Sequence, residues 1–412
     1  MSDHRRGDRR RLPVVLLEVA NLASGLGNAV VLVALPWLVL EVTGSPAFTG
    51  IVAAASALPA LVMSPLAGWL VDHLGRRAVS IGSDVMSAIS VAAIPIAAIL
   101  ADLTPTVILI LAILGAAFDP AGYTARRTLL VDAAEAAHMD QNRLNGIHEG
   151  VFAIGFVLGP VVGAAAISGI GPTNTFWIPF GLFLIAAVAV TFMRLAPAIT
   201  AGDVTDTVGW RGLTRGFTVL WQDGLLRTIT LGVLVLAAIY LPTESIVLPT
   251  YFEGLDQPGS LGLVIAALAG GSVIGAFLYG WISARMSTKR LLQVIMIGTA
   301  VSILPMAFLP PLPILMAAGF LLGFFWGPFN PLMTTLVQDR VPADQQGRVF
   351  GVQLSVFYAA PPLGMLIVGY TVETWGVSVT YLVLAGTLAV TSIAVLFARS
   401  VRQLPTRPTL ES

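Results

Sequence analysis

Twelve long apolar runs divide this chain and restrict it to structures that cross a membrane. A helix needs about 20 consecutive apolar residues to span the hydrocarbon core of a bilayer. Hydrophobic residues make up 56% of the 412 residues and charged residues only 11%, which is typical of a polytopic membrane protein. The predicted helices are 12–41, 47–72, 77–100, 105–127, 144–168, 174–194, 227–252, 259–285, 289–308, 312–336, 346–370 and 377–399. We therefore predict an all-α membrane protein with twelve transmembrane helices.

The basic residues indicate the direction in which these helices run. Cytoplasmic loops of membrane proteins carry an excess of Lys and Arg. If the N-terminus lies in the cytoplasm, the predicted cytoplasmic segments hold all 22 Lys and Arg residues. One miscounted helix would move every later loop to the other side and break this segregation. The sequence therefore predicts a multi-pass protein of the cytoplasmic (inner) membrane with both termini inside and an uncleaved first helix.

Short patterns of the first six helices return in the last six. The matching patterns are Gly68-Trp69-Leu70 with Gly280-Trp281-Ile282, Phe118-Asp119-Pro120 with Trp326-Gly327-Pro328, and Gly159-Pro160-Val161-Val162-Gly163 with Ala360-Pro361-Pro362-Leu363-Gly364. Such a repeat predicts two pseudo-symmetric six-helix bundles. The predicted domains are a basic cytoplasmic N-terminus (1–11), an N-terminal bundle (12–194), a cytoplasmic linker (195–226), a C-terminal bundle (227–399) and a cytoplasmic tail (400–412).

The predicted linker contains apolar residues at helical spacing. They are Trp210, Leu213, Phe217, Leu220 and Trp221. Basic residues lie beside them, so we expect an amphipathic helix on the cytoplasmic leaflet that tethers the two bundles.

A charged turn joins the second and third predicted helices. Its distinctive residues are Gly68, Asp72, Gly75, Arg76 and Arg77. It resembles the signature loop between helices 2 and 3 of the major facilitator superfamily, departing mainly at His73, where a fixed positive charge is usual. The resemblance implies the fold of that family, with two six-helix bundles. We expect this turn to form a gate at the inner surface, as a charge network joined by Asp84.

The fifth predicted helix carries a stripe of small residues. Its motif residues are Gly155, Gly159, Pro160 and Gly163. Small residues at this spacing let membrane helices pack closely. The run resembles a motif of proton-coupled drug exporters in the same superfamily. Over most of the chain, the order of residues from Asp119-Pro120 to this motif resembles the Tap-type efflux pumps, relatives of the enterobactin-exporter and macrolide-efflux group. The resemblance implies secondary multidrug export and does not establish the drug.

The sequence contains no motif of an enzyme or a cofactor site. It has no Gly-x-x-x-x-Gly-Lys-Ser/Thr phosphate loop and no His-Glu-x-x-His zinc motif. It also has no cysteine, so thiol catalysis and thiolate metal sites are not available. We therefore expect no enzymatic activity, no cofactor, no metal site and no nucleic-acid partner.

Acidic residues inside the predicted membrane helices are candidates for proton coupling. They are Glu244, Glu18, Asp119 and Glu149. Burial in a low dielectric favours the neutral form of a carboxyl group, so its protonation can follow the side that a cavity faces. The case is strongest for Glu244, because no basic residue is near its depth in the membrane.

The other three acids have structural alternatives. Glu18 shares a helix face with Asn21 and Asn28, and this face either lines a cavity or joins helices through the asparagines. Asp119 either lies in a cavity or pairs with Arg126 or Arg127. Glu149 either forms a protonation pair with its neighbour His148 or anchors arginines at the inner surface.

Polar and aromatic residues of the same helices are candidates for lining a substrate cavity. They are Asn21, Asn28, Tyr123, Tyr240, Trp326, Asn330 and Tyr358. We expect no Lys or Arg well inside the membrane, whereas a site for organic anions usually needs a buried cation. The combination favours an amphiphilic neutral or cationic substrate.

These observations together predict a secondary active multidrug efflux transporter that exchanges its substrate for protons by alternating access. The expected partners are small drug-like molecules, protons and membrane lipids, and the expected state is a monomer. Export of an endogenous metabolite such as a siderophore is the alternative among transporters. A lipid scramblase or a membrane sensor is the alternative from another class of protein.

Overall fold

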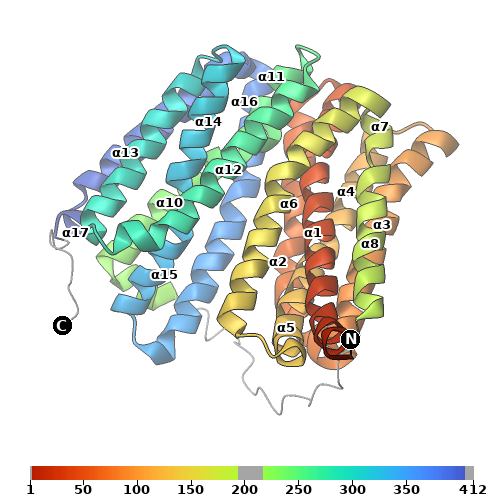
Figure 1. The fold of residues 1–412 in the computed structure, drawn as a ribbon. Helices are drawn as coiled ribbons and strands as arrows, with labels where there is room; N and C mark the ends of the chain where they lie inside the picture. The colour runs from red at the N-terminus through yellow and green to blue at the C-terminus, as the bar shows by residue number, and fades with distance from the viewer. Residues whose placement is uncertain (1, 194–216, 404–412) are drawn as a thin grey trace. The chain divides into compact units, whose positions relative to one another are not determined.

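The computed structural model describes residues 2–193 and 217–403, which form helices joined by short turns (Figure 1). The elements are α1 (Ser2–Thr43), α2 (Pro46–Leu74), α3 (Arg76–Leu100), α4 (Pro105–Ala117), α5 (Asp119–Ala137), α6 (Gln141–Ile170), α7 (Pro172–Thr175), α8 (Trp177–Phe192), α10 (Gly224–Pro242), η1 (Thr243–Val247), α11 (Leu248–Glu253), α12 (Pro258–Ser283), α13 (Thr288–Ala307), α14 (Leu312–Trp326), α15 (Phe329–Arg340), α16 (Ala343–Phe397) and α17 (Arg399–Arg402). The described residues contain no strand, and the predicted all-α class is confirmed.

The helices also account for the predicted twelve spans. Ten helical stretches of the described residues are long and apolar enough to cross a membrane, and a shorter apolar stretch of α2, Pro46–Ala60, adds one more. One of the ten, Ala359–Phe397, contains two spans, because the chain reverses at Gly376 with φ 79° and ψ 164°. Glycine adopts this positive φ without the steric cost that a side chain would add.

Two spans are broken next to prolines, at matching places in the sequence repeat. In the fourth span, α4 gives way to α5 at Phe118, just before Asp119-Pro120. In the tenth span, α14 gives way to α15 at Gly327-Pro328. Proline has no amide hydrogen to donate and restricts the residue before it, so a continuous helix is disfavoured at both places.

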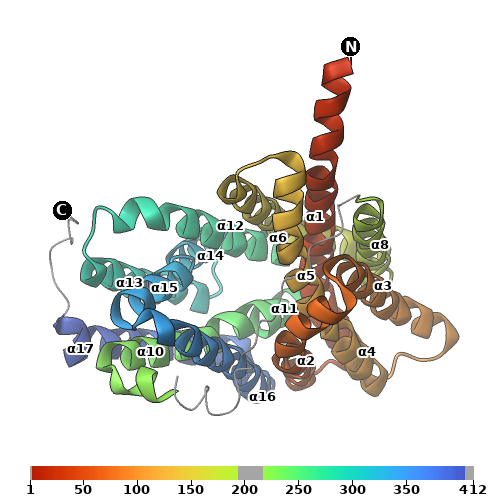
Figure 2. The ribbon, with the colours of Figure 1, turned by 90° about the horizontal axis from the view of Figure 1, so that it is seen from below.

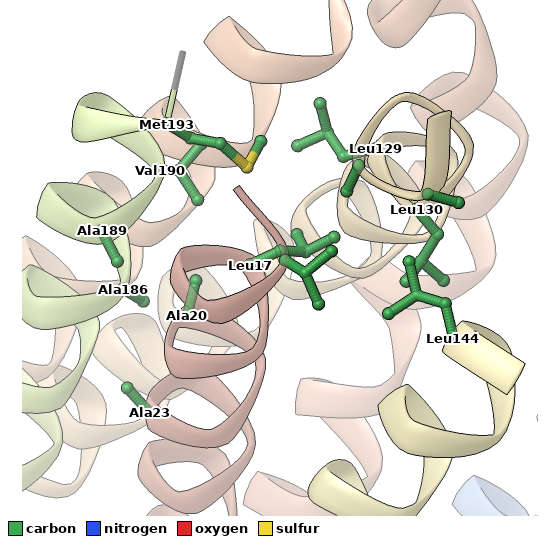
Figure 3. Close-up of a cluster of buried hydrophobic side chains, with 13 residues drawn as sticks. Leu17, Ala20, Ala23, Leu129, Leu130, Leu144, Ala186, Ala189, Val190 and Met193 are labelled. Carbon is green, nitrogen blue, oxygen red and sulfur yellow. The ribbon is translucent and has the colours of Figure 1, made fainter. Parts of the chain in front are cut away.

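The chain forms two compact units, Met1–Thr205 with Phe252–Gly262 and Asp206–Tyr251 with Leu263–Ser412. In the first unit, α1 lies between α6 and α8, with α5 beside it (Figure 2). A buried cluster joins these four helices, with Leu17 on α1, Leu129 on α5, Leu144 on α6 and Met193 at the end of α8 (Figure 3). This cluster fixes α1 at the centre of the unit.

Small residues bring α1 and α6 into close contact. A Cβ added to Gly159 would lie 2.2 Å from the Cβ of Ala29, which is closer than two carbon atoms can approach. The second unit repeats this arrangement, because a Cβ on Gly364 of α16 would lie 2.3 Å from the carbonyl oxygen of Ala238 on α10. In each unit a glycine therefore lets two helix backbones approach to a distance that a larger residue would prevent.

The described end of the predicted linker is helical. Residues 217–222 form a helix, and the rings of Phe217 and Trp221 stack with centroids 5.5 Å apart. Trp210 and Leu213, the first apolar residues of the predicted amphipathic helix, lie outside the described residues.

One side chain joins the ends of α10 and α15 in the second unit. Asp223 caps α10 by accepting hydrogen bonds from the backbone N–H groups of Leu225 and Leu226, at 2.8 and 2.9 Å. Its second oxygen accepts a hydrogen bond from Arg340 at 3.2 Å. Burial alone would raise the pKa of Asp223, but the backbone hydrogen bonds and Arg340 outweigh it and hold the pKa below its ordinary value.

Replacing Gly159 by alanine should destabilise the first unit, because α1 and α6 must separate to admit the new methyl group. We expect Gly159→Ala to lower the free energy of unfolding by about 1–3 kcal/mol. Gly169→Ala is the matched control on the same helix, since nothing lies within 4 Å of a Cβ at that position. Thermal unfolding of the detergent-solubilised protein measures both, and equal melting temperatures would contradict the packing.

The stabilisation by Asp223 should depend on pH. Because the pKa is lower in the folded state, the ionised group stabilises the fold above the ordinary Asp pKa of about 3.9, and this contribution is lost as the pH falls through the folded-state value. Asp223→Asn should therefore melt below the wild type at pH 7, and the gap should close as the pH falls below 4. If the difference in melting temperature between the wild type and Asp223→Asn stays constant over this pH range, the charge of Asp223 does not contribute to stability.

Candidate functional site

A buried ion pair lies at the centre of the first unit. The Nη1 atom of Arg126 on α5 lies 2.9 and 3.0 Å from the two carboxylate oxygens of Asp84 on α3. Its Nη2 atom donates to the hydroxyl of Ser24 on α1 at 2.8 Å. Arg126 is 5% exposed and Asp84 is 2% exposed. The pair therefore connects three helices through charge-assisted hydrogen bonds out of contact with water.

This ion pair corrects two predictions. Asp84 was expected to join Asp72, Arg76 and Arg77 in a network at the inner surface, but it pairs with Arg126 instead. The expectation that no basic residue lies well inside the membrane is wrong for Arg126, which is buried within the span Pro105–Ala137. Because Asp84 balances its charge, Arg126 adds no net positive charge to the interior.

The break between α4 and α5 places Asp119 in the first turn of α5. Its carboxylate accepts a hydrogen bond from the hydroxyl of Ser87 on α3 at 3.2 Å and another from the side chain of Asn28 on α1. Arg126 and Arg127, its expected alternative partners, form ion pairs with other acids. Asp119 is therefore held by neutral hydrogen-bond donors.

A second polar contact joins α1 to α6. The Nδ1 atom of His148 lies 3.0 Å from a carboxylate oxygen of Glu18. Asn21 donates to Glu18 at 3.3 Å and to the backbone carbonyl of His148 at 2.8 Å, and it is almost completely buried. Of the two alternatives for this helix face, lining a cavity or joining helices, Asn21 therefore fits the second.

Glu149 is exposed at the surface of the first unit, whereas the neighbouring residue His148 is buried. It forms an ion pair with Arg127, and both side chains are about half exposed, at 51% and 48%. The guanidinium group of Arg127 also lies over the ring of Tyr123, 4.8 Å from its centroid. Among the described contacts, Glu149 anchors an arginine and does not pair with His148.

The charged turn between α2 and α3 is as tight as predicted, since only Gly75 separates the two helices, with φ 86°. Arg76 pairs with Asp132 of α5 at 2.8 Å, and Arg77 donates to the carbonyl oxygens of Val190 and Thr191. Both arginines therefore tie α3 to neighbouring helices of the first unit.

The acidic residue of this turn has a different environment. Asp72 is exposed and forms no ion pair with any described residue. Gly68 lies in α2, but the structure does not describe its burial or its contacts.

In the second unit, Glu244 lies in a turn of π-helix. The α-helical pattern of α10 ends at Pro242, and η1 covers Thr243–Val247, with all five of its residues buried. Single π-turns inside α-helices occur frequently at functional sites. Glu244 is 7% exposed and forms no ion pair among the described residues. It is a buried acid without a compensating cation.

Two tyrosines surround this acid. The hydroxyl of Tyr240, one turn earlier on α10, makes a hydrogen bond with Glu244. Tyr381 of α16 is fully buried and close enough to interact electrostatically with the same carboxylate. The immediate neighbours of Glu244 are thus polar but uncharged.

The aromatic side of this site leads to a small cavity. The ring of Tyr240 stacks on Trp326 with centroids 4.8 Å apart and planes inclined by 9°. Trp326, Asn330 and Phe357 are among the residues that line an adjacent cavity of about 50 Å³. The structure therefore brings together three of the predicted cavity residues. Tyr358 lies in α16, but its side chain is outside the described residues.

Sequence reasoning missed several residues that complete these sites. Ser24 and Ser87 carry no signal of their own, because serine is common in membrane helices. Arg126 was named only as an alternative partner of Asp119, and its pairing with Asp84 was missed because the two residues lie on different helices. Tyr381 lies in the last span, and nothing local to it indicates a neighbour on α10.

Comparison with known proteins adds the family context of these residues. A family model described as Major Facilitator Superfamily matches residues 17–256 and 245–412. The chain is 37% identical over 400 residues to "Multidrug efflux pump Tap" of Mycolicibacterium fortuitum, covering 96% of this chain and 98% of that protein. A protein with the same description from Mycobacterium tuberculosis is 35% identical over 402 residues, covering 97% and 96%. "Macrolide efflux protein A" of Streptococcus pyogenes is 24% identical, covering 89% and 91%.

Solved structures share the fold at low sequence identity. The nucleoside transporter NupG has a TM-score of 0.79 at 15% identity, covering 95% of this chain and all of that one. The human organic anion transporter MFSD10 has a TM-score of 0.59 at 16% identity, covering 94% and 99%. At this identity the likeness concerns the fold alone.

Asp84 and Arg126 should stabilise the fold only when both charges are present. Arg126→Gln leaves Asp84 charged without a partner, and Asp84→Asn does the reverse, so each should lower the free energy of unfolding by about 3–5 kcal/mol. For the double variant Asp84→Asn/Arg126→Gln, the loss in free energy of unfolding should be much smaller than the sum of the losses in the two single variants. Arg127→Gln is the control, because its half-exposed ion pair contributes at most about 1 kcal/mol. Unfolding of the four variants in detergent measures the coupling, and fully additive losses would contradict it.

Proposed function

Because the chain belongs to the Major Facilitator Superfamily, we propose that it is a secondary active multidrug efflux transporter. It exports amphiphilic neutral or cationic compounds in exchange for protons, by alternating access. The family is one of transporters and not of enzymes. The proposal is supported by the Tap pumps, which match this chain over nearly its whole length and theirs.

The environment of Glu244 is the observation that supports proton coupling. An ionised carboxylate at this place is an uncompensated charge, because its described neighbours Tyr240 and Tyr381 are uncharged and it forms no ion pair among the described residues. Binding of either a proton or a cationic substrate would remove this cost. Since the two compete for one carboxylate, a proton that arrives from outside displaces a cation, which is the requirement for antiport.

The first unit supports the substrate class by its charge balance. Its buried cation, Arg126, is already neutralised by Asp84 and leaves no free positive charge for an organic anion. Asp119 is held by Ser87 and Asn28 and serves as a second carboxylate for proton transfer. Glu18 and Glu149 have partners of their own in His148 and Arg127.

The aromatic surface of the second unit suits an amphiphilic molecule. The stacked pair Tyr240 and Trp326 offers flat apolar faces, and Asn330 adds a hydrogen-bonding group at the cavity. Aromatic faces also attract cations that are removed from water. A substrate with an apolar body and a positive charge therefore matches both the aromatic surface and the neighbouring Glu244.

We further propose that the transporter lies in the cytoplasmic membrane with both termini inside and works as a monomer. The orientation rests on the segregation of the other 21 of the 22 basic residues to one side of the predicted membrane, since Arg126 is buried within its span.

Proton release from inverted membrane vesicles tests this function. Vesicles are acidified by respiration, and a cationic dye such as ethidium is added while a fluorescent probe reports the internal pH. The wild type should release protons when the dye is added, and Glu244→Gln should reduce this release at least tenfold, because a glutamine side chain binds no proton. Glu253→Gln is the control, since it removes an acid of the same span at the end of α11, outside the buried site.

Two results would contradict the proposal at different levels. Wild-type proton release in Glu244→Gln would remove the role of this residue. Efflux of the dye by the wild type without any proton release would remove antiport itself. The melting temperature of Glu244→Gln in detergent shows that a loss of coupling is not a loss of folding.

A further inference from the structure

At one end of the second unit α12 ends, α13 begins and α17 lies beside them (Figure 1), and these ends carry five basic residues. They form what we call the basic patch: Arg285, Lys289, Arg290, Arg399 and Arg402. Four of them are exposed, and Lys289 is half-buried. The proposed transport function uses none of them.

The patch is fixed in place by contacts between its elements. Lys289 donates a hydrogen bond from Nζ to the carbonyl oxygen of Arg402 at 2.8 Å, which joins α13 to α17. The side chains of Ser400 and Thr228 share a hydrogen bond of 3.1 Å, which joins α17 to α10, and Val401 is completely buried. The short helix α17 therefore holds its arginines against the beginning of α13.

No acid among the described residues neutralises the patch. The recorded ion pairs include none of its five members. The acids at the ends of α10 and α15 have other neighbours, Arg340 for Asp223 and Tyr279 for Asp339. Five like charges without a counter-charge among the described residues repel one another, so a bound anion would stabilise this arrangement.

Exposed aromatic rings border the patch on the side of the membrane. The guanidinium group of Arg285 lies 4.2 Å from the ring centroid of Trp281, and that of Arg402 lies 4.9 Å from Phe397. The two aromatic residues are 60% and 64% exposed. Aromatic rings and arginines with this exposure mark the interface between hydrocarbon and headgroups, where each finds both an apolar and a polar environment.

Exposed apolar side chains continue from the rings into the membrane. Phe277 on α12 precedes Arg285 by about two turns and is exposed, as is Val294 on α13, between one and two turns after Lys289. A ligand that fits this surface needs a negative group at the patch and hydrocarbon beyond it. A soluble anion would meet only the first requirement.

We propose that the basic patch binds the phosphate headgroup of an anionic phospholipid, whose acyl chains lie along the exposed apolar faces of α12 and α13. Basic pockets between membrane helices are known to recognise such headgroups. The site is separate from the buried acid of the second unit, so lipid binding and proton coupling can be tested independently.

Equilibrium binding of a fluorescent phosphatidylglycerol to the purified full-length protein in detergent tests the site. The Arg285→Gln/Arg402→Gln variant should bind the probe about 25-fold more weakly, at roughly fivefold for each charge removed. The Arg285→Lys/Arg402→Lys variant keeps the charges and should bind within a few-fold of the wild type. Arg143→Gln removes an exposed arginine at the start of α6 and should leave the affinity unchanged.

Competition separates a lipid site from a simple anion site. Unlabelled phosphatidylglycerol should displace the probe, whereas phosphatidylcholine and millimolar inorganic phosphate should not. Equal affinity of the wild type and the glutamine double variant would overturn the proposal. An equal loss in Arg143→Gln, or displacement by phosphatidylcholine or phosphate, would do so as well. Unchanged melting temperatures confirm that each variant is folded, and all the substituted side chains are exposed.

Discussion

An ionised group inside a membrane must be neutralised by the protein itself, because lipid cannot hydrate it. In the first unit, Arg126 meets this constraint with Asp84 and Ser24, and the resulting hydrogen bonds hold α5, α3 and α1 together. Removing either charge would leave the other buried without a partner, so the pair acts as one structural unit. The arrangement of the first unit depends on this neutrality.

The second unit meets the same constraint in a different way. Glu244 has a tyrosine hydroxyl and no cation among the described residues, so in the proposed function a proton or a positive ligand balances its charge. The ionisable groups are therefore of two kinds: Arg126 and Asp84 form an ion pair, whereas Glu244, like Asp119 in the first unit, forms no ion pair among the described residues. An acid of the second kind is the better candidate for coupling, because its neutralisation changes with what is bound.

The sequence predicted the features that depend on length and on local backbone chemistry. The twelve spans followed from the length of the apolar runs, and the tight turn at Gly75 followed from glycine. The breaks beside Pro120 and Pro328 lie at prolines that the repeat had paired, although no break was predicted there. These signals are local, since each residue type restricts its own backbone.

The partners of the charged residues could not be predicted in the same way. Helical periodicity shows which residues share a face, but not which other helix lies opposite that face. Asp84 was therefore assigned to the arginines nearest in sequence, although its partner Arg126 is 42 residues away on α5. The pairing of Glu18 with His148 was missed for the same reason, since the two residues are 130 positions apart in the sequence.

The π-turn around Glu244 has a consequence for how this span is built. A π-turn holds one residue more than an α-turn, so everything after it is rotated by about 100° relative to an uninterrupted α-helix. The span therefore behaves as an α-helix with a single-residue insertion at residues 243–247. The number of residues in this turn, and not only their chemistry, sets which way Glu244 and the helix beyond it point.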